Sequence, residues 1–159
     1  MTQQTILLAL GSNLGDRQAA LRDAQARLAA AGVPVLQASS VHETPALMPA
    51  GAPADWARAY LNQVLRAQTA LAPHELLRTL KDIEAAMGRR PAERWAPRVI
   101  DIDILDHEGR CLSDETLELP HAQMHLRRFV MAPLCEIAPD WVHPRLQRTA
   151  LAILQELPA

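Results

Sequence analysis

The feature that most restricts the fold of this chain is a strict alternation of apolar and acidic residues within positions 98–105, Arg-Val-Ile-Asp-Ile-Asp-Ile-Leu. Successive side chains of a β-strand point to opposite faces, so an alternating segment has one apolar face and one polar face. Asp101 and Asp103 would share the polar face, with their Cα atoms about 6.5–7 Å apart. The apolar face would carry Ile100, Ile102 and Ile104. The pattern predicts a strand that packs on a core and presents two carboxylates on its other side.

The remainder of the chain predicts an α+β sandwich, with helices packed on a mostly antiparallel sheet. Strands and helices alternate, but without the regular strand-helix-strand rhythm of a parallel sheet. Apolar runs predict further strands at 6–10, 33–43 and 60–69. Apolar spacing predicts helices at 16–31, 73–87 and 149–157, and glycines end the first two. Two loops, at 44–58 and 88–97, and a hairpin arm near 111–119 complete the pattern.

Composition narrows the class of protein. A length of 159 residues with 49% hydrophobic content predicts one globular domain, residues 1–159. A net charge of −2 predicts no general attraction to nucleic acid or to a membrane. Cys111 and Cys135 show no paired spacing, and the first residues lack the pattern of a secretion signal. We therefore expect a cytoplasmic protein with reduced thiols.

The acidic pair has two interpretations. Taken alone, Asp-x-Asp on an edge strand is more often a solvated polar face than a metal site. Four arginines, however, lie just before or at the start of the strand: Arg89, Arg90, Arg94 and Arg98. Carboxylates suit Mg²⁺, and planar guanidinium groups suit phosphate oxygens. Together they favour a nucleotide site over a charged surface loop.

A glycine-containing segment, Gly-Ser-Asn-Leu-Gly-Asp-Arg at 11–17, connects the first strand to the first helix. It matches neither GxxxxGK[ST] nor GxGxxG, so it is not one of the usual nucleotide motifs. We interpret it as a tight strand-to-helix turn in which Asp16 caps the helix.

Several blocks in a fixed order resemble the family of 6-hydroxymethyl-7,8-dihydropterin pyrophosphokinases. They cover nearly the whole chain: LALGSNLGDR at 8–17, ETP at 43–45, YLNQV at 60–64, LAPHELLRTLKDIEAAMGR at 71–89, ERWAPRVIDIDIL at 93–105, LPH at 119–121 and MHLRRFVMAPLCEIAPD at 124–140. The resemblance implies a ferredoxin-like α+β sandwich. It also implies transfer of pyrophosphate from ATP, as co-substrate, to the hydroxymethyl group of the pterin, with release of AMP. The family uses two Mg²⁺ ions, and we expect a monomer.

The resemblance assigns roles to residues around the nucleotide. It implies that Asp101 and Asp103 bind both metal ions and that, with Arg89 and Arg98, they form the catalytic group. The residues implied in ATP binding are Lys81, Glu84, Arg89, Arg98, His121 and Arg127. For Lys81 and Glu84, an ordinary exposed position on a helix is nearly as good an interpretation. Because His121 and His125 are four apart but lack a third ligand, we reject a zinc site.

A second set of residues is implied in binding the flat, polar pterin: Thr44, Pro45, Leu47, Tyr60, Asn62, Trp95 and Phe129. Tyr60 and Phe129 would stack on the pterin ring, and Asn62 would read its amide edge. Core packing is the alternative for the two aromatic residues. Trp95 lies in the 88–97 loop, which together with the 44–58 loop would close over the substrates.

The sequence departs from the family pattern at three places. Ala122 replaces an aromatic residue that many members have after the histidine, so we expect one phosphate or nucleotide contact of the family to be missing. Asp106-His107 indicates that the acidic strand ends early. The 44–58 loop is longer than usual, with Trp56 added.

Two other functions fit the sequence less well than the enzyme does. An RNA-recognition module of ferredoxin-like fold would carry several aromatic residues and a basic surface, but this chain is 3% aromatic and has a negative net charge. An inactive regulatory relative would be expected to lack part of the group formed by Asp101, Asp103, Arg89 and Arg98. All four are present.

Overall fold

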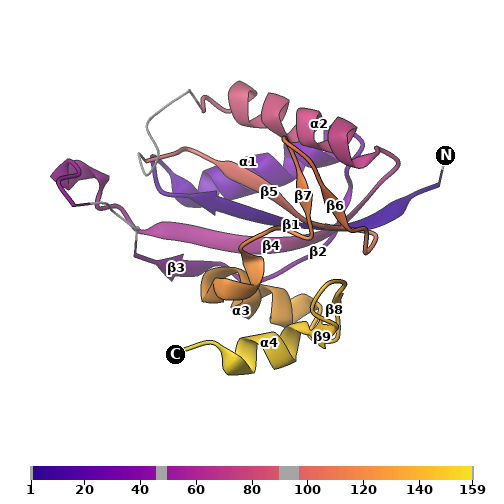
Figure 1. The fold of residues 1–159 in the computed structure, drawn as a ribbon. Helices are drawn as coiled ribbons and strands as arrows, with labels where there is room; N and C mark the ends of the chain where they lie inside the picture. Colours follow the sequence, from indigo (N-terminus) through magenta and orange to yellow (C-terminus); the bar gives the residue numbers. More distant parts are fainter. Residues whose placement is uncertain (1, 46–49, 90–96, 159) are drawn as a thin grey trace.

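The computed structural model describes residues 2–45, 50–89 and 97–158. An antiparallel five-stranded sheet lies at its centre, in the order β2-β4-β1-β5, with β3 also paired to β4 (Figure 1). The strands are β1 (Gln4–Ser12), β2 (Val35–Ala38), β3 (His42–Thr44), β4 (Tyr60–Thr69) and β5 (Asp101–His107). This arrangement confirms the predicted α+β sandwich.

Two long helices cover one face of the sheet, α1 (Arg17–Ala30) and α2 (Pro73–Ala86) (Figure 1). Asp16 caps α1 as predicted, because its carboxylate accepts a hydrogen bond from the Ala19 amide at 3.0 Å. Pro73 occupies the first turn of α2, where its missing N–H costs no helix hydrogen bond. Gly32 and Gly88 follow the two helices with φ of 87° and 97°, a conformation that favours glycine.

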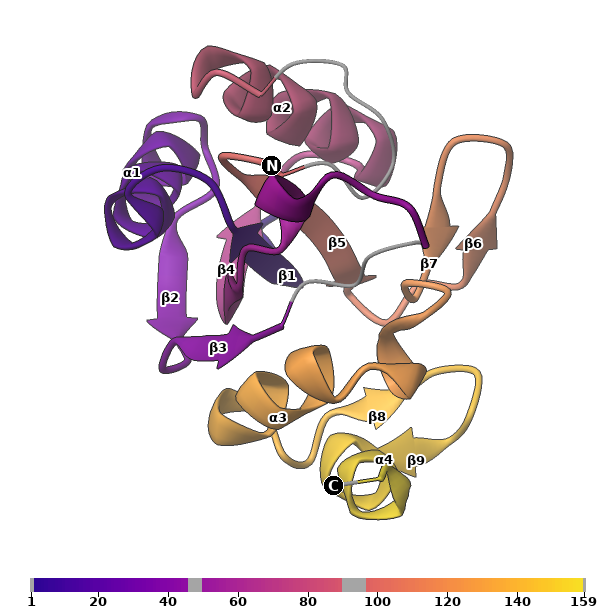
Figure 2. The same ribbon diagram turned by 90° about the vertical axis from the view of Figure 1, so that its left-hand side faces the viewer.

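The opposite face is covered by α3 (Arg128–Ile137) and α4 (Ala150–Glu156) (Figures 1 and 2). Short elements complete this part of the chain: the hairpins β6 (Leu112–Ser113) with β7 (Glu118–Leu119) and β8 (Val142–His143) with β9 (Arg148–Thr149), and the 3-10 turns η1 (Ala54–Trp56) and η2 (Met124–Leu126). The predicted hairpin arm and final helix are both confirmed. None of the helices in the described ranges is both long and apolar enough to cross a bilayer.

Two hydrophobic cores lie on the two faces of the sheet. Ile100, Ile102 and Ile104 belong to the core under α1 and α2, as the alternation predicted. Leu7, Val64 and other residues form the second core with α3 and α4. Asp101 and Asp103 of β5 therefore face the side of the sheet on which α3 lies.

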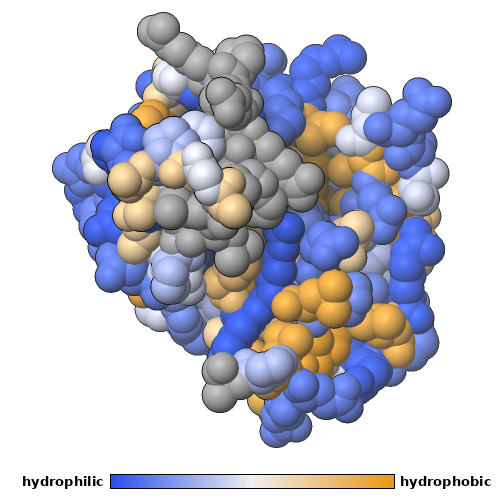
Figure 3. All heavy atoms as spheres, turned by 60° about the vertical axis from the view of Figure 1, so that its left-hand side comes forward, coloured by the Kyte–Doolittle hydropathy of each residue, from blue (hydrophilic) through white to orange (hydrophobic). Residues whose placement is uncertain are grey.

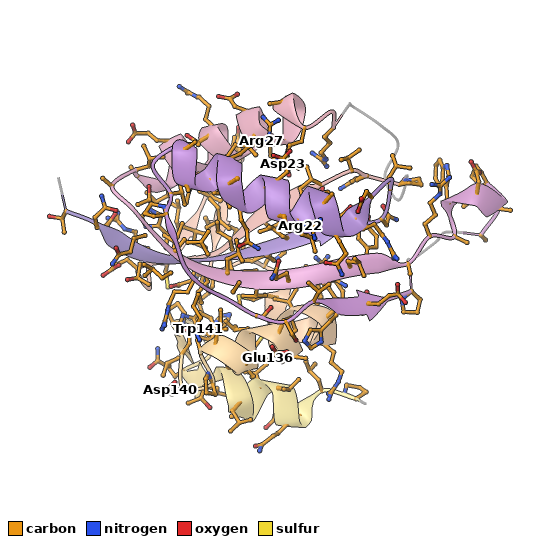
Figure 4. All side chains as sticks on the ribbon, turned by 180° about the vertical axis from the view of Figure 1, so that it is seen from behind. Arg22, Asp23, Arg27, Glu136, Asp140 and Trp141 are labelled. Carbon is orange, nitrogen blue, oxygen red and sulfur yellow. The ribbon has the colours of Figure 1, made fainter. Side chains whose placement is uncertain are left out.

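A carboxylate joins α3 to the edge of the sheet. Both oxygens of Glu136, which is labelled in Figure 4, accept hydrogen bonds from Ser40, one from its amide and one from its hydroxyl, each at 2.8 Å. His42 on β3 also pairs with this carboxylate. The amide of Ser40 and the imidazole of His42 lower the pKa of Glu136. We call Ser40, His42 and Glu136 the α3 clamp.

Two expectations about strands were wrong in detail. The single strand expected at 33–43 is divided into β2 and β3, because Ser39 between them bonds Val64 through its hydroxyl as well as its amide. The acidic strand does not end early, since β5 continues through Asp106 and His107, both buried. A β-bulge opposite Leu7 and Leu8 accommodates this end, and His107 bonds the Leu71 carbonyl oxygen at 2.9 Å.

Candidate active site

A cleft of about 580 Å³ lies on the α3 side of the sheet. Its floor is β1, β4 and β5, and its wall includes the start of α3. Most of the residues predicted to bind substrates line it: Thr44, Pro45, Tyr60, Asn62, Lys81, Arg89, Arg98, Asp101, Asp103, Arg127 and Phe129. Turned so that the left-hand end of Figure 1 comes forward, the surface is mainly hydrophilic, with apolar areas at its upper right and in its lower part (Figure 3). Segments far apart in the sequence therefore meet in one cleft.

Strand register explains how this happens. On one row across the sheet, Gly11 of β1 pairs with Asn62 of β4 on one side and with Asp101 of β5 on the other. On the next equivalent row, Ala9 lies opposite Asp103. The two residues of β1 in these rows are small, so the centre of the floor is open between the amide and the carboxylates.

The carboxylates differ in their surroundings. Asp103 is exposed, whereas Asp101 is partly buried and its carboxylate touches two arginines. Arg89 lies 3.0 Å and Arg98 3.3 Å from Asp101 Oδ1. Burial raises the pKa of Asp101, the two guanidinium groups oppose that rise, and Asp103 adds to it.

Glu84 pairs with cations of this charged group. Its side chain is buried, with an exposed fraction of 2% for the residue, so the interpretation as an exposed helix residue is wrong. One carboxylate oxygen pairs with Arg89 at 3.1 Å and Lys81 at 3.3 Å, and the other accepts the Ile102 amide at 2.7 Å. Burial raises the pKa of Glu84, while the amide and the two cations lower it. The end of α2 is thereby fixed to β5.

The chemistry of the donors can be compared with that of a metal site. No group of three or more His, Cys, Asp or Glu side chains able to hold a metal occurs in the described parts of the chain. Asp101 and Asp103 instead offer two carboxylates toward the same cleft. Mg²⁺ is commonly held by one or two carboxylates, with water and substrate phosphates as its other ligands. The donor set therefore fits Mg²⁺ together with a phosphate-bearing ligand.

The other half of the cleft is uncharged. The Asn62 amide nitrogen donates to Thr44 Oγ1 at 2.7 Å and to the His42 carbonyl oxygen at 3.3 Å. Its Oδ1 faces the floor, 3.6 Å from the position that a Cβ on Gly11 would occupy. The ring of Tyr60 lies equally close to that position, at 3.5 Å. Asn62 thus offers a fixed hydrogen-bond acceptor beside an aromatic ring.

Phe129 and Arg127 contribute from the start of α3. Phe129 lines the cleft together with Tyr60, and the Arg127 guanidinium carbon lies 5.7 Å from the Phe129 ring centroid. Burial, followed by the charge of Asp101, raises the pKa of Tyr60, so its phenol stays neutral. Two aromatic side chains from different elements are therefore available to a flat ligand.

The two histidines of the 119–125 region have different surroundings. His121 is half-buried near Asp103 and Arg127, and burial lowers its pKa. Its Nδ1 accepts the Gln123 amide at 3.1 Å, so the neutral ring carries its proton on Nε2. His125 packs edge-on against His143, with ring centroids 5.8 Å apart. Leu47 and Trp95, which the resemblance assigns to the pterin, lie outside the described residues, as do Arg90 and Arg94.

Sequence reasoning missed part of the floor. Gly11 was assigned only to a tight turn, yet it lines the centre of the cleft together with Ala9. A signal was present: in Leu-Ala-Leu-Gly at 8–11, large residues alternate with small ones. Such a strand has one face that fills a core and one that leaves space.

The fold and the cleft together define a class of protein: an α+β sandwich with one cleft, of which one half is charged and the other is neutral and aromatic. The chain belongs to the 7,8-dihydro-6-hydroxymethylpterin-pyrophosphokinase (HPPK) family, whose sequence model matches residues 7–139.

Named relatives agree with this assignment. A 2-amino-4-hydroxy-6-hydroxymethyldihydropteridine pyrophosphokinase of Methylorubrum extorquens is 48% identical over 137 residues, covering 85% of this chain and 83% of the relative. A protein of the same name from Bacillus subtilis is 44% identical over 131 residues, covering 82% and 75%. The fold also resembles a crystal structure of Plasmodium falciparum HPPK-DHPS with pteroate, at a TM-score of 0.73 and 14% identity. The match covers 98% of this chain but only 42% of that longer one.

Proposed function

We propose that this chain transfers pyrophosphate from ATP to the hydroxymethyl group of 6-hydroxymethyl-7,8-dihydropterin and releases AMP. The observation that carries the proposal is the division of one cleft into two halves. Arg89, Arg98, Asp101 and Asp103 lie on one side, and Tyr60, Asn62 and Phe129 line the same cleft. Two curated relatives that cover most of the chain bear the name of this enzyme.

The charged half suits the triphosphate. Arg89 and Arg98 would transfer their contacts from Asp101 to phosphate oxygens, with Lys81 and Arg127 adding positive charge from the cleft wall. Two bound Mg²⁺ ions, held by Asp101 and Asp103, would neutralise phosphate charge and orient the β-phosphorus. Glu84 would keep Arg89 in place, and His121 would offer its Nε2 hydrogen to a phosphate oxygen.

The neutral half suits the pterin. Asn62 Oδ1 would accept a hydrogen bond from an N–H of the pterin amide edge, while Thr44 holds the Asn62 side chain in position. Tyr60 and Phe129 would stack on the ring, and Pro45 would close its edge. The loop residues Leu47 and Trp95 would complete this pocket.

Direct transfer needs no covalent enzyme intermediate. The hydroxyl oxygen of the pterin would form a bond to the β-phosphorus while the bond from that phosphorus to the AMP oxygen breaks, and the hydroxyl proton would be released to water. Among the described residues that line the cleft there is no serine or cysteine that could act as a nucleophile. Positioning and electrostatic stabilisation would therefore supply the catalysis.

Further properties belong to this proposal. We infer a single domain over residues 1–159 that acts as a monomer in the cytoplasm, without binding to nucleic acid or membrane. The net charge of −2 supports the last point. An RNA-recognition module would need an open aromatic sheet face, whereas α3 and α4 pack on this one.

A coupled assay for AMP tests the function. Purified protein, ATP, Mg²⁺ and 6-hydroxymethyl-7,8-dihydropterin should yield AMP, and omission of the pterin or of Mg²⁺ should abolish it. If ATP and the pterin are left unchanged under all conditions, while calorimetry shows that both bind, the chain is an inactive relative and the proposal fails.

A further inference from the structure

The segment 11–17, which we call the GSN turn, contacts the ends of both long loops beside the cleft. Asn13 lies at its centre and is 2% exposed. Its side-chain Oδ1 accepts a hydrogen bond from the backbone N–H of Arg98 at 2.7 Å. Its backbone N–H donates to the Arg98 carbonyl oxygen at 3.1 Å. The backbone of Arg98 is therefore held on both sides by a single residue.

The same side chain reaches the other half of the cleft. Asn13 Nδ2 donates to the carbonyl oxygen of Arg58 at 3.2 Å, two residues before Tyr60 at the start of β4. Arg17, at the end of the GSN turn, donates to the Ala59 carbonyl oxygen at 2.9 Å and pairs with Glu43 of β3 at 3.0 Å. These contacts fix the segment that leads directly to Tyr60 and Asn62.

We propose that Asn13 is a positioning residue that holds Arg98, on the nucleotide side, and the start of β4, on the pterin side, in fixed relation to each other. Asn13 is not among the residues that line the cleft, so it acts through Arg98 and Tyr60. An amide is suited to this task because it donates and accepts at once, without bringing a charge into a buried place. The assignment of the two sides rests on the proposed function.

Arg17 divides the proposal into two parts that can be tested separately. Within the described parts of the chain, its side chain bonds Glu43 and Ala59, both on the pterin side. Asn13 reaches both sides. Asp16, between them, accepts the Ala19 amide through its carboxylate and caps α1. Three neighbouring residues of one turn thus have three different sets of contacts.

The experiment compares Asn13→Ala, Arg17→Met and Asp16→Ala with the unmodified protein. Calorimetry gives the dissociation constants of a non-hydrolysable ATP analogue with Mg²⁺ and of the pterin, and urea unfolding gives stability. Asn13→Ala should weaken both ligands, each by about tenfold, since the loss of a buried hydrogen-bond partner typically costs that much. Arg17→Met should weaken the pterin alone, and Asp16→Ala should lower stability while both affinities stay unchanged.

An identical pattern in Asn13→Ala and Asp16→Ala would overturn the inference, because it would reduce Asn13 to a stabilising residue of the turn. Arg17 has a partly exposed side chain, so Arg17→Met keeps the test decisive if Asn13→Ala does not fold. Loss of nucleotide affinity in Arg17→Met would also contradict the proposal. AMP formation by the unmodified protein is measured in parallel, so a failure of the proposed function is distinguished from a failure of this inference.

Discussion

The two halves of the cleft are built by different means. On the side that we propose for the pterin, neutral groups bond one another, as in the contacts of Asn62 with Thr44 and with the His42 carbonyl oxygen. On the side that we propose for the nucleotide, charged groups pair among themselves, as in the contacts of Asp101 with Arg89 and Arg98. We expect the neutral half to keep its bonds when a ligand binds, and the charged half to exchange its partners.

This difference has an energetic reason. A carboxylate and a guanidinium group that lose water are costly unless each meets an opposite charge. Without ligand, Asp101 and the arginines meet that need together; with ligand, Mg²⁺ and phosphate would do so instead. The neutral half has no such need, so its side chains can be fixed in advance and serve shape recognition.

The largest effect on turnover is expected from removing a carboxylate from the charged half of the cleft. Asp103→Ala should lower turnover by more than about 100-fold, because even partners of metal ligands cost about 10- to 100-fold when removed. Asp103 is exposed, so the melting temperature should hardly change. Steady-state AMP formation and thermal unfolding measure the two effects, with the exposed Asp82→Ala as the matched control. Strong residual turnover in Asp103→Ala would exclude this carboxylate from metal binding.

The substitution Asn62→Ala tests the neutral half of the cleft. Pterin affinity should fall by about tenfold or more, since the acceptor of the amide edge is lost. Affinity for the ATP analogue with Mg²⁺ should stay nearly constant, because Asn62 has no contact with the charged pairs. Calorimetric titration with each ligand decides the point. Comparable losses for both ligands would show that the pterin edge lies elsewhere.

Ionic strength should affect ligand binding to the two halves differently, and this test needs no mutation. Raising the KCl concentration should weaken binding of the ATP analogue with Mg²⁺ several-fold, because exposed charges are screened. Pterin binding should stay within a factor of about two, since its contacts are neutral hydrogen bonds and stacking. Titrations over a salt series measure both. Equal salt dependence would mean that the pterin site is not neutral.

The smallest effect is expected from a charged group remote from the cleft. The amides of Thr116 and Leu117, aided by His74, lower the pKa of Asp114 to about 2 from 3.8. A lowered pKa stabilises the folded state above the unfolded value, and this contribution disappears as pH falls from 3.8 toward 2. Urea midpoints of the unmodified protein and Asp114→Asn should therefore differ slightly at neutral pH and converge near pH 2.

Ligand affinities should not change in Asp114→Asn, which makes it a reference for the charge pairs of the cleft. A gap between the two urea midpoints that persists at the lowest pH would contradict the role of the charge and leave only the shape of the turn.

Local patterns predicted most of the secondary structure. The alternation around Asp101 and Asp103 gave the correct faces of β5, and glycine positions gave the ends of α1 and α2. What failed depended on distant contacts. The division at Ser39 arises from its bonds to Val64, and the burial of Asp106 and His107 arises from the bulge and from Leu71. Neither partner is visible in the neighbouring sequence.

The candidate site was predicted to a similar extent. Residues with distinctive chemistry, such as the arginines and the aromatic residues, stand out in a sequence and were placed in the cleft. Glu84 was named through the resemblance alone and Asn13 was not named, because a glutamate on a helix or an asparagine in a turn is common on surfaces. Only their burial and their bonds to Ile102 and Arg98 distinguish them.

The α3 clamp has a consequence for the kinds of molecule that fit. Glu136 ties α3, which carries Phe129, to the segment leading into β3, and β3 in turn pairs Thr44 with Tyr60. The helix that carries Phe129 and the strand that pairs with Tyr60 are therefore linked, and moving them apart would break the hydrogen bonds of Glu136 with Ser40. We therefore expect this link to favour flat ligands in the cleft that Phe129 and Tyr60 line.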